Sequence, residues 1–152
     1  NDVLEGQAGF DSMLFNGANV SENIDIFANG GRALFFRDVA SVTMDLNDVE
    51  AIDFNALGGA DNIRIRDLSG TDVTTVRIDL AGALGGGDGA VDTVTIDGTG
   101  GDDVVVVVGD GNAIRVLGLA AEVVITGFEA GVDRLVINGL AGDDVIEASG
   151  LL

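Results

Sequence analysis

The chain has 152 residues, enough for one domain with a hydrophobic core, and it carries 26 acidic residues against seven Arg and no Lys. The net charge of -19 argues against nucleic acid or an anionic membrane as a partner and favours cations, or simply solubility. Because Cys and His are both missing, disulfides, thiol chemistry and the usual imidazole base or metal ligand are excluded.

The composition also predicts ordered β-structure. Gly occurs 24 times and Pro not at all, so we expect the glycines to form turns between short strands of Val and Ile. Seven Phe are the only aromatic residues, which predicts a thin, mainly aliphatic core. No apolar stretch is long enough for a membrane-spanning helix.

Short alternating segments follow one another along the chain. Asn1–Glu5 (NDVLE) is similar to Asp143–Glu147 (DDVIE), near the other end. The next segments read as four strands, interrupted by the turn signal at residues 28–31 (ANGG). These expected strands are Asp11–Phe15, Asn23–Phe27, Arg32–Phe36 and Ser41–Asp45.

The pattern continues to the end of the chain, with a loose glycine loop at Gly82–Gly89. No segment offers a helical apolar period longer than one turn, and we therefore expect an all-β protein. The remaining expected strands are Glu50–Phe54, Asn62–Arg66, Thr74–Leu80, Thr93–Ile96, Val104–Val108, Ala113–Leu117, Glu122–Thr126, Arg134–Ile137 and Val145–Glu147.

The segments form an internal repeat. Each copy begins with an acid, continues with alternating apolar residues and a glycine turn, and then reaches a second acid and a second apolar run. The leading acids are Asp11, Glu50, Asp92 and Asp133, so successive copies begin about 40 residues apart. We therefore expect a single repeat domain over 1–152, with units that start near 11, 50, 92 and 133.

Three all-β architectures suit a strand every ten or so residues. A β-propeller agrees with the unit length but lacks the usual blade markers, and a sandwich does not explain the repetition. The thin core and the repeated glycine-acid corners favour a parallel β-solenoid, that is, a β-roll or right-handed β-helix. Two coils of roughly 20 residues would then make one unit.

The corners between strands combine Gly with Asp, as in Gly9-Phe10-Asp11 and Gly142-Asp143-Asp144. Stacked coils would bring such carboxylates within about 4.8 Å of one another, where like charges repel unless they are protonated, solvated or bridged by a cation. Hard oxygen ligands suit Ca²⁺. As single turns, the same residues also serve as ordinary corner formers through side chain to backbone hydrogen bonds.

One segment resembles a known calcium-binding family. Leu4–Met13 (LEGQAGFDSM) is one residue away from the Leu-x-Gly-Gly-x-Gly-x-Asp-x-apolar nonapeptide of the RTX (repeats-in-toxin, haemolysin-type) family, with Gln7 in place of the second Gly. The longer unit is similar to divergent repeats of large bacterial RTX-like secreted and surface proteins. The resemblance implies a right-handed parallel β-roll, type I secretion, and folding in extracellular calcium.

The resemblance also implies ligands. Asp11 and Asp103 would supply carboxylates, and Gly6, Gly9, Gly98 and Gly101 would supply carbonyl groups. Further carboxylates at matching corners are Asp61, Asp92, Asp133 and Asp144.

These features favour an extracellular or cell-surface structural module that acts as a calcium-stabilised scaffold, with calcium as its cofactor and partner. The alternative is a self-assembling filament or adhesin subunit in which calcium is incidental. The valine run Val104–Val108 supports association, since with Val104, Val106 and Val108 inward it would expose two valines. A polysaccharide-acting β-helix enzyme is a third possibility, but the adjacent acids of Asp102-Asp103 point to opposite faces of a strand and form a poor catalytic pair.

Overall fold

The computed structural model describes residues 1–151, which form fourteen β-strands and one 3₁₀ turn, Val39–Ser41. The chain is all-β, as the sequence predicts, and each expected strand is present within a few residues of its expected bounds. Within residues 1–151, no helix is long and apolar enough to cross a membrane. The strands are β1 (Asp2–Glu5), β2 (Ser12–Asn16), β3 (Asn23–Asn29), β4 (Arg32–Arg37), β5 (Val42–Asn47), β6 (Ala51–Leu57), β7 (Asn62–Ile65), β8 (Thr75–Gly82), β9 (Thr93–Asp97), β10 (Val104–Gly109), β11 (Ala113–Leu117), β12 (Glu122–Thr126), β13 (Arg134–Asn138) and β14 (Val145–Gly150).

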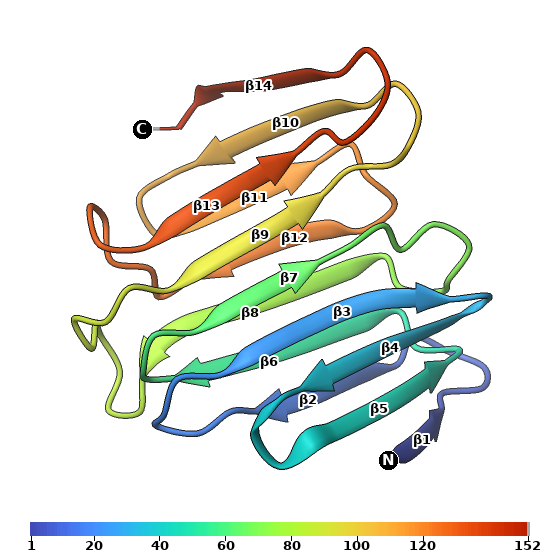
Figure 1. The fold of residues 1–152 in the computed structure, drawn as a ribbon, viewed down its shortest axis with the longest axis horizontal. Coiled ribbons are helices and arrows are strands. Elements are labelled where there is room, and N and C mark those ends of the chain that lie inside the picture. Colours follow the sequence, from blue (N-terminus) through green and yellow to red (C-terminus); the bar gives the residue numbers. More distant parts are fainter. Residues whose placement is uncertain (152) are drawn as a thin grey trace.

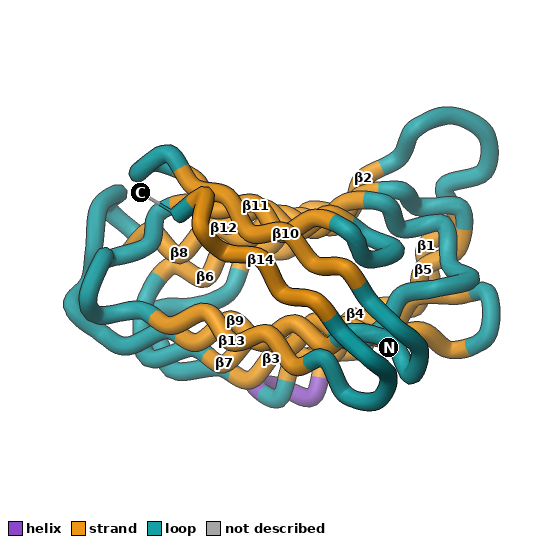
Figure 2. Tube along the Cα trace, turned by 90° about the horizontal axis from the view of Figure 1, so that it is seen from above, coloured by secondary structure: helices purple, strands orange, loops and turns teal. Residues whose placement is uncertain are grey.

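The strands form two seven-stranded sheets that face each other (Figures 1 and 2). Sheet A has the order β1-β5-β4-β3-β7-β9-β13, and sheet B has the order β14-β10-β11-β12-β8-β6-β2 (Figure 1). The chain crosses repeatedly from one sheet to the other, so that each return to a sheet completes one circuit. Apolar side chains from the inner faces meet between the two layers and form one continuous core.

Most neighbouring strands are parallel, but each sheet contains one antiparallel strand, β4 in sheet A and β11 in sheet B. The β3–β4 connection is a two-residue loop, Gly30-Gly31, and Gly30 has a φ of 65°. Such loops favour residues that adopt a positive φ, so the ANGG signal creates a hairpin. The sheets are therefore mixed, in contrast to the all-parallel sheets expected from the repeats.

The sequence period corresponds to one circuit and not to two coils of half that length. Asn16 of β2 pairs with Asn55 of β6, and Asp97 of β9 pairs with Asn138 of β13, so each of these partners lies one period farther along the chain. In the first of these circuits the chain adds one strand to sheet B but three to sheet A, because the β3–β4–β5 meander stays within sheet A. Only the circuit from β6 to β8 is much shorter, since Ala51 pairs with Thr75.

Strand β1 and the C-terminal segment that it resembles in sequence lie in different sheets. Strand β1 belongs to sheet A, whereas β14, which contains the similar Val145–Glu147, belongs to sheet B. The spacing to the following corner explains the placement. Gly6 precedes Asp11 by the same interval as Gly98 precedes Asp103, so β1 corresponds to β9 at the start of a circuit.

The valine run of β10 faces the core with the other set of residues from the one considered above, in which Val104, Val106 and Val108 point inward. Val105 and Val107 are buried in the core, whereas Val104 lies on the outer face. Strand pairing decides which valines face inward, because the position of β10 directly after Asp103 is set by its registers with β14 and β11. A run of identical residues contains no alternation from which to predict this choice.

The aromatic residues concentrate in the N-terminal half of the core. Phe15, Phe35 and Phe54 form a cluster with ring centroids 4.7 to 6.4 Å apart. Phe35 and Phe54 are fully buried. Farther along the stack the core is aliphatic, as the composition predicts.

Replacing Phe54 with Ala should destabilise the fold by about 3 to 5 kcal/mol, because it leaves a cavity in this buried cluster. Urea unfolding followed by circular dichroism measures the change. Phe10→Ala is the matched control, since Phe10 is 67% exposed and its loss should alter stability by less than about 0.5 kcal/mol. Equal effects of the two substitutions would contradict the described core.

Candidate site at the carboxylate corners

Four acidic residues stand directly before four parallel strands of sheet A. They precede β3, β7, β9 and β13, whose starting points lie one above another at the left edge of Figure 1. We call them column 1, which consists of Glu22, Asp61, Asp92 and Asp133.

Backbone hydrogen bonds link column 1 from one circuit to the next. The Glu22 N–H donates to Asp61 Oδ1 at 2.7 Å, the Asp61 N–H to Asp92 Oδ1 at 2.8 Å, and the Asp92 N–H to Asp133 Oδ1 at 3.0 Å. In return, the N–H after each of the last three acids donates to the carbonyl of the acid in the preceding circuit, at 2.8 to 2.9 Å. The side chains of Asp61, Asp92 and Asp133 thus supply a hydrogen bond between circuits that backbone pairing alone does not provide at a corner.

The two ends of column 1 are satisfied locally. Glu22 forms an ion pair with Arg37 and accepts a hydrogen bond from the Ala18 N–H at 3.0 Å. At the other end, Asp133 Oδ2 accepts a hydrogen bond from the Glu129 N–H at 2.6 Å. The interior members form no ion pair within residues 1–151, so their charges depend on backbone donors.

Burial makes the interior of column 1 sensitive to pH. Asp61 and Asp92 are almost completely inaccessible to solvent. Burial raises the pKa of Asp61 to about 7, and the charges of Asp92, Glu22 and Asp88 add to this, although the Glu22 N–H opposes it. Burial likewise raises the pKa of Asp92 to about 6. Protonation near neutral pH therefore relieves the repulsion between stacked acids.

A second set of acids precedes four strands of sheet B at the opposite edge. These residues, Asp11, Glu50, Asp103 and Asp144, stand before β2, β6, β10 and β14, and we call them column 2. The Asp11 N–H donates to Glu50 Oε2 at 2.7 Å, and the Asp103 N–H donates to Asp144 Oδ1 at 3.0 Å. Column 2 is divided into two pairs, because β8, β12 and β11 lie between β6 and β10. Thr74 occupies the position before β8, where its N–H donates to the Glu50 carbonyl.

The corners need glycine where a carboxylate folds back against the chain. A Cβ at Gly98 would lie 2.6 Å from Asp103 Oδ2 and 3.0 Å from the Gly139 carbonyl oxygen. A Cβ at Gly139 would lie 2.3 Å from Asp144 Oδ2. The side chain of Asp103 uses this space to accept a hydrogen bond from the Thr99 N–H at 2.7 Å.

The sequence-predicted site residues divide between the two columns. Asp61, Asp92 and Asp133 come together in column 1, and Asp103 meets Asp144 in column 2. Asp11 pairs instead with Glu50, so the structure does not bring it together with Asp103. The predicted glycines lie in the two corresponding corners, Gly6 and Gly9 before Asp11, and Gly98 and Gly101 before Asp103.

An alignment of the repeat copies by their leading acids is shifted by half a circuit, because it matches strands of sheet B with strands of sheet A. Asp11 and Glu50 lead strands of sheet B, whereas Asp92 and Asp133 lead strands of sheet A. The true counterpart of Asp92 in the first unit is Glu22, a buried residue that is not among the predicted ligands. The similarity of Ser21–Ile26 (SENIDI) to Ala60–Ile65 (ADNIRI) could have identified it.

The acids fit a metal less well than they fit backbone donors. Within the part of the chain that the structure describes, no three His, Cys, Asp or Glu side chains form a group that could hold a metal ion. Two buried carboxylate oxygens have no hydrogen-bond partner there, Asp11 Oδ2 and Asp61 Oδ2. Each lies in a separate column, so the columns offer single orphan oxygens and not a continuous calcium ladder.

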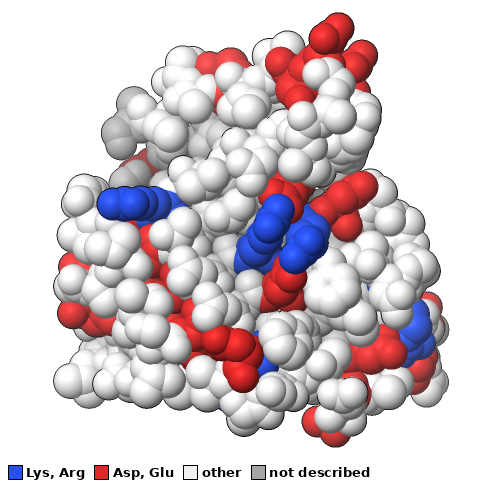
Figure 3. Space-filling model, in the orientation of Figure 1, with Lys and Arg blue, Asp and Glu red and all other residues white. Residues whose placement is uncertain are grey.

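Most of the Arg side chains lie at the surface, whereas Arg37 is largely buried beside Glu22. Figure 3 shows two of them together at the centre of sheet A, surrounded by carboxylates. Arg64 pairs with Asp97 at 2.7 Å and Arg66 pairs with Asp25 at 2.6 Å. Among residues 1–151, Arg134 is the one Arg without an ion pair.

Gly98→Ala should destabilise the protein by on the order of 2 kcal/mol, because the new Cβ collides with a carboxylate oxygen and a carbonyl. Gly100→Ala, in the same corner, is the control, since a Cβ there meets no atom within 4 Å. Thermal unfolding of both variants checks the prediction. A Gly98→Ala protein as stable as Gly100→Ala would show that the corner does not require glycine.

The raised pKa of Asp61 predicts that stability falls as the pH rises. The folded state binds the Asp61 proton more tightly than the unfolded chain does, so the contribution is complete below about pH 4 and is lost as the pH passes about 7. Between pH 5 and pH 8, the loss should be on the order of 2 kcal/mol. Asp61→Asn should reduce this loss and stabilise the protein at pH 8.

Urea unfolding at a series of pH values measures this dependence. Asp67→Asn is the matched control, because Asp67 is exposed and belongs to neither column. It should keep the wild-type profile. A profile shared by Asp61→Asn and the wild type would refute the link between column 1 and pH.

Comparisons with protein-family models, with curated proteins and with solved structures return no match. A functional assignment therefore depends on the geometry of the two columns.

Proposed function

We propose that this chain is a structural repeat module of an extracellular protein and that its fold is a variant of the β-solenoid, with hairpins inserted into two of its circuits. The observation that carries this proposal is column 1, in which a backbone N–H of each circuit is bound by a carboxylate of the next. The acids with the greatest burial are thus used to join circuits. This use of the buried acids favours a role as a scaffold or spacer over a role in catalysis.

The hydrogen-bonding of the buried acids supports a mechanical role. A force applied along the stack would have to separate neighbouring circuits, and at each corner it would meet a hydrogen bond to a carboxylate in addition to the strand ladder. A hydrogen bond within a protein contributes about 0.5 to 1.5 kcal/mol, so each such corner adds to the resistance of the strand ladder. Corners usually lack such links, because loops run over the surface without regular pairing.

Calcium is a second candidate contribution to the same function. The observation that favours it is Asp11 Oδ2, a buried oxygen without a partner among residues 1–151, in the segment Leu4–Met13 that resembles the RTX nonapeptide. In this proposal Asp11, with carbonyl groups of Gly6 and Gly9, would hold the ion, and binding would add to folding free energy. The extracellular location follows from the same resemblance and from the availability of calcium outside cells.

Single-molecule pulling tests both parts of the proposal. A chain held by its two ends should resist extension and should lengthen in steps of about 14 nm, which is one circuit of roughly 40 residues. Calcium should raise the force of the step that releases the first circuit, relative to a chelator, and magnesium should not. Asp11→Asn should abolish this difference.

The outcomes separate the two ideas. A chain that extends at the force of an unfolded polypeptide would rule out a scaffold. Equal forces in calcium and in chelator, with the steps retained, would rule out the calcium site and leave the scaffold role standing. Asp67→Asn provides the control for a general change in charge.

A further inference from the structure

A groove lies on the outer face of sheet A, away from both ends of the stack. Its volume is about 340 Å³, and small-molecule sites have about 300 to 1,000 Å³. It is formed by β3, β4, β7 and β9, each of which is paired with a neighbour on both sides. The outward-facing side chains around it are Asn23, Asp25, Phe36, Asn62, Arg64 and Thr95.

The alternation of the strands directs these side chains away from the core. Ile24, Ile63 and Val94 are buried, so the residues next to them in the chain face the surface. Phe36 faces the surface for the same reason, since Phe35 before it is fully buried. Strand pairing then places four of the groove residues next to one another in a single row across the sheet, in the order Phe36, Asp25, Arg64 and Thr95.

Three side chains of the groove keep hydrogen-bonding groups that no atom of residues 1–151 uses. Arg64 donates from Nε to Asp97 at 2.7 Å, which leaves the N–H groups of both Nη atoms. Asn62 donates from Nδ2 to Asn23 at 3.3 Å, which leaves the Asn62 Oδ1 as an acceptor. The Thr95 hydroxyl, beside Arg64 in the row, completes the set. The groove thus offers donors and acceptors together, with the Phe36 ring as an apolar wall.

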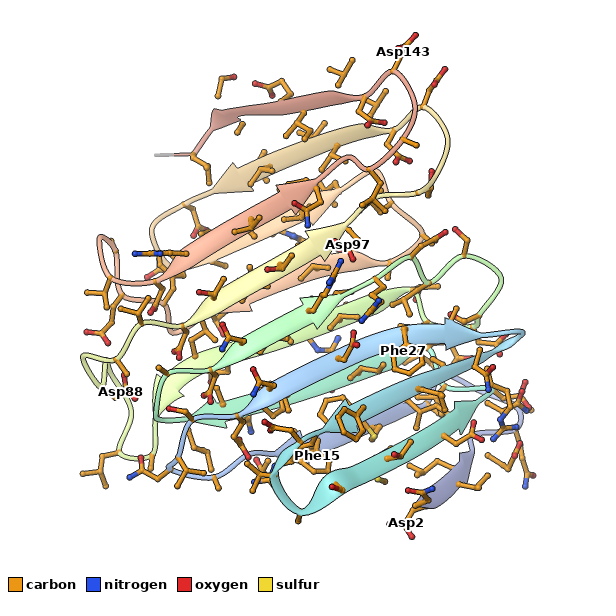
Figure 4. All side chains as sticks on the ribbon, in the orientation of Figure 1. Asp2, Phe15, Phe27, Asp88, Asp97 and Asp143 are labelled. Carbon is orange, nitrogen blue, oxygen red and sulfur yellow. The ribbon has the colours of Figure 1, made fainter. Side chains whose placement is uncertain are left out.

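The charges beside the groove are already neutralised in pairs. Arg64 pairs with Asp97, and Arg66 pairs with Asp25 through two hydrogen bonds of 2.6 and 2.8 Å. Figure 4 shows Asp97 on β9 at this face of the sheet. An anion would approach a chain of net charge -19, and a cation would meet the Arg64 guanidinium. The groove therefore suits an uncharged ligand.

We propose that this groove binds a neutral saccharide. A sugar ring carries adjacent hydroxyl groups, each of which both donates and accepts, and has a face of C–H groups. The Arg64 fork donates to two neighbouring hydroxyls, the Asn62 Oδ1 accepts from one of them, and the Phe36 ring packs against the C–H face.

The same observations disfavour a peptide and a catalytic role. A peptide that adds a strand needs an open sheet edge, whereas the strands of the groove are paired on both sides. Asp25 and Asp97 are both held by Arg side chains, so neither is free to protonate a glycosidic oxygen. The groove therefore binds a sugar without cleaving it. This binding goes beyond the scaffold role and does not require calcium.

Two-dimensional NMR of the isotope-labelled chain tests the proposal with neutral sugars as probes. The probes are glucose, galactose, mannose, cellotetraose and mannotetraose. At least one of them should shift the amide signals of residues 23–25, 62–64 and 93–95 to saturation. The Kd should be on the order of 1 mM, because an open groove leaves much of the ligand in water. Glycerol should cause no such shifts, and the uronic acid of the hexose that binds should bind more weakly.

Two substitutions in the groove should weaken the binding and leave the fold intact. Thr95→Val removes the hydroxyl and keeps the shape, and Arg64→Lys keeps the charge but loses the guanidinium fork. Each should raise the Kd by about 2- to 10-fold, the equivalent of one hydrogen bond. The matched controls are Thr43→Val, on the same face outside the groove, and Arg77→Lys, on sheet B. Arg77 and Arg64 side chains are both 45% exposed, so the two Lys substitutions differ only in place.

Circular dichroism shows whether each variant is folded, and Thr95→Val alone is a sufficient test if Arg64→Lys is not. Four results would overturn the proposal. These are a chain whose signals no sugar shifts, a Kd that both folded groove variants leave unchanged, the same shifts with glycerol, and tighter binding of the uronic acid. None of them bears on the scaffold role, because pulling single molecules tests that role without any sugar.

Discussion

The fold depends on hydrogen bonds that backbone N–H groups donate to buried carboxylates at the corners between circuits. A parallel stack of short strands has no hydrogen-bonded turn to hold successive corners together, and the N–H that precedes each strand would otherwise have no partner. In column 1 the carboxylate of the next circuit supplies that partner. The acid, the glycine that gives it room and the strand that follows it therefore form one unit, which explains why the three recur together in the sequence.

This arrangement brings like charges close together in a protein that is already strongly acidic. The structure limits the cost in three ways. Burial raises the pKa values of Asp61 and Asp92, so that protons neutralise part of column 1 near neutral pH. The Arg37 guanidinium neutralises Glu22 at the end of the column. Column 2 is interrupted by β8, β12 and β11, which keep its two acid pairs apart.

The sequence was sufficient to predict the strands, the all-β class and the period, because each depends on local alternation and on glycine. It was not sufficient to predict how the repeats map onto the sheets. Glu50 and Asp92 begin similar segments, yet they precede strands of different sheets. Which sheet a segment joins depends on pairings with residues a full circuit away, and these pairings also set the inward face of Val104–Val108.

The candidate site was predictable in part. The corner acids were identified as a recurring group from their glycine neighbours, and five of the predicted metal residues do meet one another in the two columns. Glu22 was missed because its corner, Gly17–Glu22 (GANVSE), lacks the second glycine that stands shortly before each of the predicted acids. Hydrogen bonding by backbone donors could not be foreseen from composition, since it requires knowledge of which circuit follows which.

The two inserted hairpins have a consequence for the geometry of the whole stack. One adds two strands to sheet A in the N-terminal half, and the other adds two strands to sheet B in the C-terminal half. Each insertion alone would lengthen one wall by roughly 10 Å and tilt the end of the molecule. Together they compensate, so that both walls have seven strands. A natural or engineered change in the number of hairpins must therefore occur in pairs, one on each wall, if the body is to remain straight.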